Sequence, residues 1–157
     1  MSTPADSLLG ALGPILQAVS PEEAPLLLAA LERMAADKYR VWAAQTDDPV
    51  ERAGLLDCAH REVAIAEFIE SLDEKNAERT AVLLKRLPDL QALYDGVLAG
   101  QDRKEQLRRQ AAGELGGADF LRQFRAAQSG AVAAQFEALA LGEEANARFL
   151  TVLTDSM

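Results

Sequence analysis

Apolar residues between positions 132 and 153 recur in alternating steps of four and three, and this spacing limits the fold more than any other feature. The positions are 132, 136, 139, 143, 146, 150 and 153, and five of the seven carry apolar side chains. Such spacing places one face of a helix against neighbouring helices. The two exceptions, Glu143 and Asn146, lie in the middle of this face, where a polar group costs free energy unless it is paired or hydrogen-bonded. The sequence therefore predicts a packed helix with a polar layer at its centre.

Composition favours helix throughout the chain. Hydrophobic residues make up 49% of the 157 residues but aromatic residues only 5%, so alanine and leucine supply most of the apolar content. Both are good helix formers. We therefore expect an all-α fold, with residues 1–157 forming a single helical domain. Residues 1–19, where Gly10, Gly13 and Pro14 interrupt the apolar pattern, are expected to form a short or broken helix packed on this domain.

The charge, the single cysteine and the N-terminus indicate the surroundings of the protein. A formal net charge of −9 disfavours a nucleic-acid partner, because binding to phosphates needs a basic face. Cys58 is the only cysteine, so no internal disulfide is expected and a reducing compartment is favoured. The first residues carry no basic side chain, and no uncharged apolar run reaches the roughly 18 residues of a membrane span. We expect a cytoplasmic protein that does not bind membranes.

Two capping motifs predict a helical hairpin. In "SPEE" (20–23), Ser20 precedes a proline at the first helical position and Glu23 completes a capping box. In "TDDPVE" (46–51), Asp48 is the expected capping residue. Proline follows it directly, and a glutamate stands three residues after Asp48. These motifs predict a helix that ends near residue 45 and another that ends near residue 71. The short turn between them makes the two helices antiparallel neighbours.

Shorter helices and a long closing helix are expected in the rest of the chain. Pro88 is a stop signal, and the paired glycines 116 and 117 are expected to end another helix. From residue 118 onward the pattern is helical again, with a break or bend at "QSG" (128–130). The arrangement predicted is thus four helices with additional short ones. The short helices are expected at 76–87, 89–100 and 101–117.

Polar side chains recur on both helices of the first hairpin. At about 100° per residue, Asp57 and His60 fall within one narrow stripe together with Glu67 and small alanines. This stripe borders an apolar one, so Asp57 and His60, the only histidine, are expected to point inward or along the edge of the core. The apolar seam of the preceding helix is made by Leu28, Leu31, Ala35, Tyr39 and Trp42. Glu32 and Tyr39 lie one heptad apart at its border. One carboxylate and one phenol should thus face the second helix.

In these motifs the chain resembles the ferritin-like superfamily, the four-helix proteins that include rubrerythrins and bacterioferritins. In that family one helix supplies a glutamate and the next a Glu-x-x-His motif, and both recur in the second half of the chain to hold two irons. Glu32 matches the first glutamate, and Asp57-x-x-His60 matches the second-helix motif with aspartate in place of glutamate. Glu143-x-x-Asn146 matches the last motif with asparagine in place of histidine. The resemblance implies a ferritin-like antiparallel four-helix bundle.

The departures from the family pattern lie in the ligands. The resemblance covers residues 20–73 and 129–155 but not the third helix, where Glu105 and Glu114 are loose candidates for the remaining carboxylate. One imidazole is missing, and Asp57 is one methylene shorter than glutamate. Iron oxidation and iron storage are therefore disfavoured.

Two interpretations of the polar residues stay open. The favoured one is a hydrogen-bonded polar layer that fixes the register of the helices. The other is a mononuclear metal site, since carboxylate and imidazole ligands suit iron, manganese or zinc. The layer would consist of Tyr39, Asp57, His60, Glu143 and Asn146, and the metal ligands would be Glu32, Asp57, His60 and Glu143.

No other motif points to an activity. There is no P-loop, dinucleotide-binding glycine pattern or Cys-x-x-Cys pair, and Cys58 and His60 point away from each other on a helix. We expect a non-catalytic binding or structural protein without a cofactor, which forms a homodimer through alanine-rich helix faces. The alternative is an iron- or manganese-dependent oxidoreductase with a reduced ligand set around His60. A third interpretation is an adaptor that binds a protein partner through its acidic surface or through residues 1–19.

Overall fold

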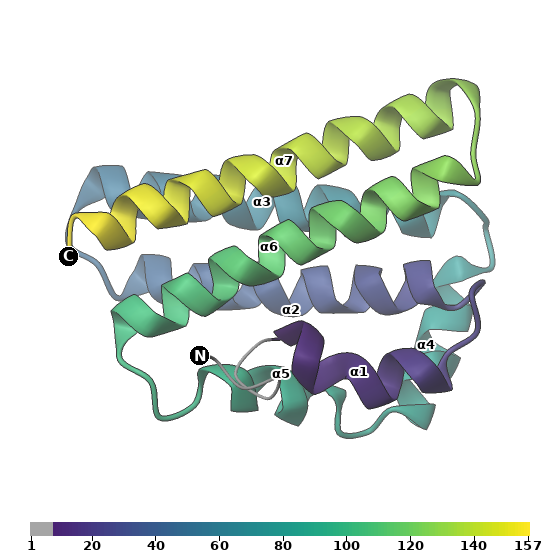
Figure 1. Ribbon diagram of the computed structural model, residues 1–157, viewed down its shortest axis with the longest axis horizontal. Coiled ribbons are helices and arrows are strands. Elements are labelled where there is room, and N and C mark those ends of the chain that lie inside the picture. The colour runs from purple at the N-terminus through teal and green to yellow at the C-terminus, as the bar shows by residue number, and fades with distance from the viewer. Residues whose placement is uncertain (1–7) are drawn as a thin grey trace. The chain divides into compact units, whose positions relative to one another are not determined.

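The structure is a computed structural model of the chain that describes residues 8–157 (Figure 1). These residues form seven α-helices, and no strand occurs among them, so the all-α prediction is confirmed. None of the described helices combines the length and the apolar character needed to cross a membrane. The helices are α1 (Leu8–Ala18), α2 (Ala24–Ala44), α3 (Pro49–Ser71), α4 (Asn76–Arg86), α5 (Leu90–Leu98), α6 (Arg103–Ala126) and α7 (Gly130–Asp155).

The chain divides into two compact units. The first unit is Pro14–Tyr94 and contains α2, α3 and α4. The second unit is Asp95–Met157 together with the described residues up to Gly13, and it contains α6 and α7. The boundary between the units runs through α1 and α5. The expected single domain over residues 1–157 stays a prediction.

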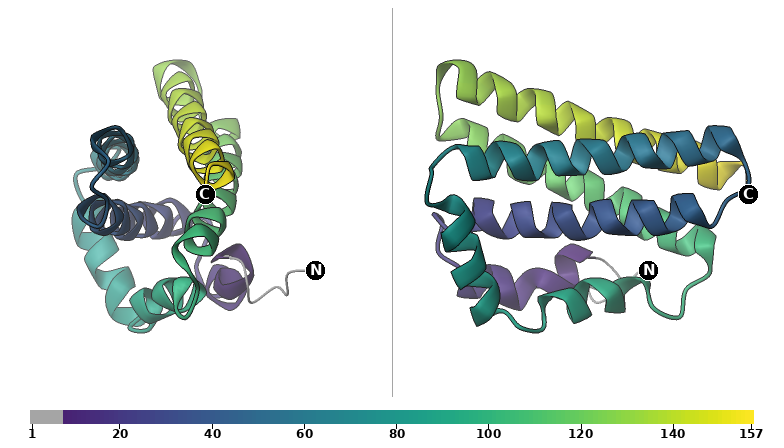
Figure 2. Two further views of the ribbon diagram at one scale, coloured as in Figure 1. Left: turned by 90° about the vertical axis from the view of Figure 1, so that its left-hand side faces the viewer. Right: turned by 180° about the vertical axis from the view of Figure 1, so that it is seen from behind.

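The predicted caps shape the first unit. Ser20 and Glu23 form the predicted pair of hydrogen bonds, in which the Glu23 N–H donates to Ser20 Oγ at 3.3 Å and the Ser20 N–H donates to Glu23 Oε2 at 3.0 Å. They close a turn at residues 21–23, and α2 itself begins at Ala24 with Glu23 as its N-cap residue, so the predicted helix start at the first proline is wrong. Asp48 accepts from the backbone N–H groups of Val50 and Glu51 at the start of α3. A cap of this kind contributes about 1 kcal/mol. The short turn between the end of α2 at Ala44 and the start of α3 at Pro49 leaves the two helices side by side (Figure 2, right).

The seam predicted for α2 forms its packing face. Tyr39 and Trp42 are almost fully buried, and their rings meet edge to face with centroids 5.6 Å apart. On the outer side of this hairpin, Arg33 of α2 donates through Nε and Nη2 to both carboxylate oxygens of Glu70 of α3, at 2.9 and 2.7 Å. These hydrogen bonds raise the pKa of the Arg33 guanidinium. Packing inside and a two-point ion pair outside thus join the two helices.

The second unit consists mainly of α6 and α7, which run side by side (Figure 1). The seam predicted for α7 is buried at its five central positions, from Phe136 to Leu150. The break predicted at "QSG" is present between the two helices, and Gly130 there has a φ of +60°. Arg122 of α6 donates to Glu144 of α7 at 2.6 Å and to Glu137 at 3.2 Å. These bonds raise the pKa of Arg122 and lower the pKa of Glu144.

Two sequence expectations about helix ends have different outcomes. The N-terminal helix α1 is short, as predicted, but it continues through Pro14 rather than breaking there. Part of the segment 1–19 falls outside the described residues, because they begin at residue 8. The stop predicted at residues 116 and 117 is wrong, since α6 continues through both glycines to Ala126. The reason lies in what packs against Gly117, which is described below.

Candidate functional site

The first unit contains a pair of buried glutamates. Glu32 on α2 is 6% exposed and Glu62 on α3 is completely buried. A carboxylate oxygen of Glu32 lies within 4.8 Å of one of Glu62. Burial of two carboxyl groups at this separation disfavours two simultaneous negative charges, so a proton, a hydrogen-bond donor or a cation has to compensate. The pair is therefore a structural or a ligand-binding feature of the α2–α3 hairpin.

Glu62 occupies this place because it lies on the packing face of α3. The buried positions of α3 follow steps of three and four, which is the spacing of a helix packed along one side. Glu62 is the central one, between Ala59 and Ala66. The buried residues of α3 are Leu55, Cys58, Ala59, Glu62, Ile65, Ala66 and Ile69.

The structure corrects the expected positions of Asp57 and His60. Both side chains are exposed, whereas an inward or edge position was predicted. At 100° per residue, they lie about 140° and 160° from the centre of the buried face of α3. The expected metal set of Glu32, Asp57, His60 and Glu143 therefore includes two residues of α3 that point away from Glu32. Its metal-binding role stays a prediction, and the carboxylate that α3 brings to Glu32 is Glu62.

The second unit contains a buried polar layer between α6 and α7. Glu114 of α6 is 2% exposed and accepts two hydrogen bonds. Gln110, one turn earlier on α6, donates through Nε2 to Glu114 Oε1 at 2.6 Å. Asn146 of α7 donates through Nδ2 to Glu114 Oε2 at 3.4 Å. Both oxygens of this carboxyl group are thus oriented by amide side chains, one from each helix.

Gly117 makes room for the second glutamate of this unit. Glu143 of α7 is 1% exposed, and its carboxyl group lies directly on the backbone of α6. A β-carbon added at Gly117 would be 3.0 Å from Glu143 Oε1 and 3.2 Å from Glu143 Cδ. Glycine at position 117 is therefore a place of close approach inside a helix, which explains why it does not end α6.

The buried polar residues that the sequence predicted for one layer are divided between the two units. Tyr39 is buried in the first unit, and Glu143 and Asn146 are buried in the second. Of the two candidates for the third-helix carboxylate, Glu114 is buried, whereas Glu105 is at the surface in an ion pair with Arg109, with Nε to Oε1 at 3.0 Å. The layer expected from Tyr39, Asp57, His60, Glu143 and Asn146 therefore loses its two members on α3.

Sequence reasoning missed Glu62, Gln110 and Gly117. For Glu62 a signal was present, because it lies seven residues from both Leu55 and Ile69, which places it on the same face of the helix as these two apolar residues. For Gln110 the signal was its spacing of four from Glu114, which places both side chains on one face of a helix. For Gly117 no local signal separates a helix stop from a close approach. The neighbour that decides between them lies on another helix.

The ligand set of the implied di-iron centre is not met by these residues. In the family pattern a histidine follows the second-helix and fourth-helix glutamates by three residues. Three residues after Glu62 stands Ile65, which has no ligand atom and is 1% exposed. Three residues after Glu143 stands Asn146, whose amide donates to Glu114. The buried residues supply carboxylate and amide groups but no imidazole, so they do not fit this centre.

Comparison of the chain with protein-family models, with curated proteins and with solved structures gives no significant match in any of the three. The similarity to ferritin-like proteins therefore depends on the positions of the motif residues alone, and membership of that superfamily stays a prediction.

Proposed function

We propose that this chain is a ferritin-like four-helix protein with a binding or structural role, in which the buried glutamates fix the register of the helices and do not hold a redox metal. One buried glutamate lies on each of the four long helices: Glu32, Glu62, Glu114 and Glu143. That distribution matches the carboxylate part of the family pattern. It supports the proposed kinship more closely than Asp57 and His60 do.

The observation that supports the non-catalytic role is that Ile65 stands where the family pattern has the second-helix histidine. A buried isoleucine in place of the second-helix histidine removes a nitrogen ligand and closes the position with an apolar side chain. The hydrogen bond that Asn146 donates to Glu114 supports the structural role, since it links α7 to α6 at one register, and the bond that Gln110 donates orients the Glu114 carboxyl group within α6. Polar groups with satisfied hydrogen bonds in a helical core serve this purpose in other helical proteins.

A second candidate is a metal-dependent oxidoreductase that uses iron or manganese with a reduced ligand set. The observation that favours it is the pair Glu32 and Glu62, whose carboxylate oxygens lie within 4.8 Å of each other. Oxygen ligands suit manganese, magnesium and calcium and are also accepted by iron. In this version the glutamates replace His60 as the candidate ligands, because His60 is exposed.

Aerobic oxidation of Fe(II) separates the two candidates. We expect the purified chain to oxidise Fe(II) no faster than an equal concentration of a control protein, because the imidazoles are missing. Glu62→Gln should leave this rate unchanged. Its matched control is Glu67→Gln, which alters an exposed glutamate of the same helix. A rate well above the control that Glu62→Gln abolishes and Glu67→Gln preserves would favour the oxidoreductase.

Self-association as a homodimer is also proposed. Exposed apolar side chains on the outer faces of α2 and α3 support this proposal, because such residues are common in contacts between subunits. Val41 is 47% exposed, Val50 77% and Leu56 37%. Exposed alanines at positions 53 and 64 of α3 would allow two such faces to approach closely.

A further inference from the structure

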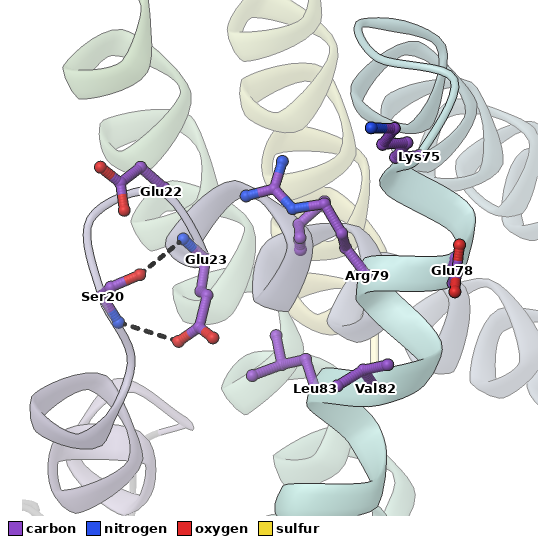
Figure 3. Close-up of a pocket in the computed structure, with 9 residues that line it drawn as sticks. Ser20, Glu22, Glu23, Lys75, Glu78, Arg79, Val82 and Leu83 are labelled. Atoms are coloured by element: carbon purple, nitrogen blue, oxygen red, sulfur yellow. Dashed lines mark hydrogen bonds between the residues drawn. The ribbon is translucent and has the colours of Figure 1, made fainter.

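The first unit contains a surface pocket that the proposed function does not use (Figure 3). It has a volume of about 440 Å³ and lies between the turn before α2 and one face of α4. This volume is within the range of small-molecule sites, roughly 300–1,000 Å³. All of its lining residues belong to the first unit. The pocket is therefore a feature of that unit by itself.

The base of the pocket is apolar. Leu26 of α2 and Leu83 of α4 line it and are 2% and 1% exposed, so they are fixed by the packing of the unit. Val82 lies beside Leu83 and is 52% exposed. Leu26 and Leu83 therefore close the floor of the pocket, and Val82 supplies most of the accessible apolar surface of these three side chains. Such a surface binds an aliphatic chain through the hydrophobic effect.

Two cations line the pocket: Lys75, the residue that precedes α4, and Arg79 in the first turn of α4. In Figure 3 the guanidinium of Arg79 extends from α4 toward the turn at residues 20–23, and Lys75 stands at the N-terminal end of that helix. Arg79 donates through Nη1 to Asn76 Oδ1 at 3.1 Å. Asn76 is 6% exposed and donates in turn to the Ile69 carbonyl at 2.9 Å. A buried amide thus holds Arg79 in place while most of its N–H groups stay available.

The acidic residues of the pocket do not neutralise these cations. Among the described residues, neither Lys75 nor Arg79 has a carboxylate within ion-pair distance. The Glu23 carboxylate instead accepts from the Ser20 N–H and from Arg86, and these bonds lower the pKa of Glu23. Glu78 points away from the turn in Figure 3. Glu22 is exposed at the rim.

We propose that this pocket binds a small amphipathic carboxylate. The carboxylate head accepts two hydrogen bonds from the fork of Arg79, which is the preferred geometry for an arginine and a carboxylate. Lys75 adds a second positive charge to the same lining. The aliphatic chain lies along Val82, over the floor that Leu26 and Leu83 form. A head group alone would lack the apolar contact, and a cationic head would be repelled by Lys75 and Arg79.

Titration of the full chain with octanoate, below its micelle concentration, tests this proposal by backbone amide NMR. We expect saturable shifts at α4 and at residues 20–26. Acetate supplies the head group alone and should bind at least about tenfold more weakly, and octylamine, with the same chain and the opposite charge, should shift no residue of the pocket. A tenfold loss corresponds to about 1.4 kcal/mol.

Arg79→Gln removes the held cation and should weaken octanoate binding at least about tenfold. Lys85→Gln is the matched control, since it removes an exposed cation of the same helix that does not line the pocket. Circular dichroism should give both variants the melting temperature of the wild type, so that a loss of binding reports on the pocket. The proposal is overturned if octanoate gives no saturable shifts, if octylamine binds equally well, or if Arg79→Gln binds as the wild type does.

Discussion

Gly117→Val is expected to lower the free energy of unfolding by about 2 kcal/mol, the range measured when side chains are inserted into packed cores. The β-carbon alone would be 3.0 Å from Glu143 Oε1, and the two γ-carbons of valine add volume in the same region. The buried carboxyl group of Glu143 or the spacing of α6 and α7 has to change. Chemical denaturation of the wild type and the variant measures the loss.

Two controls separate this clash from the effect of any glycine replacement. Gly113→Ala lies one turn earlier on α6, where a β-carbon would meet only Leu8 Cδ2 at an ordinary 3.6 Å. It should stabilise the protein by about 0.5–1 kcal/mol through helix propensity. In a double-mutant cycle, Glu143→Ala should relieve a large part of the Gly117→Val penalty, because the two residues are in contact. Strict additivity of the two changes would contradict this account of Gly117.

Glu114→Leu is expected to destabilise the protein by about 2–4 kcal/mol. Leucine removes the acceptor of the Gln110 amide, at 2.6 Å, and of the Asn146 amide, at 3.4 Å. Loss of a partner in a buried site costs about 1–3 kcal/mol for each group that is affected. The measurement is again the free energy of unfolding in denaturant.

Glu114→Gln is the conservative control for this prediction. It keeps the shape of the side chain and one carbonyl oxygen as an acceptor, so its effect should be clearly smaller than that of leucine. Asp119→Leu changes an exposed acid of the same helix and should alter stability by less than about 0.5 kcal/mol. If Glu114→Leu proves as stable as the wild type, the layer does not fix the register of α6 and α7.

The helices were predictable where the local motifs, such as capping residues, agree with the spacing of the apolar residues that pack. The hydrogen bonds predicted at Ser20 and Asp48 are local and form within three residues, so both are present in the structure, although only Asp48 is the N-cap of its helix and α2 begins at Ala24. The α7 seam was predictable because its apolar positions form one clear stripe. Position 117 was not, because glycine is read locally as a stop although the side chain that needs its space comes from α7.

The face of α3 was misassigned for a different physical reason. This helix carries apolar residues on its exposed side as well as on its buried side. Leu56 and Val50 are exposed, whereas Leu55 and Ile65 are buried. The apolar residues therefore do not single out one face of α3, and the stripe that contains His60 was predicted to point inward or along the edge of the core although it faces outward. Glu62 is the ionisable residue of the buried face. Its heptad spacing from Leu55 and Ile69 was a signal, but glutamate is rarely buried, so spacing alone did not distinguish it from the exposed acids of the same helix.

The most direct test of the central claim is the metal content of the purified chain after growth with added iron, manganese or zinc. Wild type, Glu62→Gln, His60→Ala and the control Glu67→Gln would be analysed after removal of loosely bound ions. Because Ile65 and Asn146 supply no imidazole, we predict no stoichiometric metal in any of the four, and His60→Ala should fold normally since His60 is exposed. Stoichiometric iron or manganese in the wild type and in Glu67→Gln, lost in Glu62→Gln, would contradict the account and make the buried glutamates metal ligands.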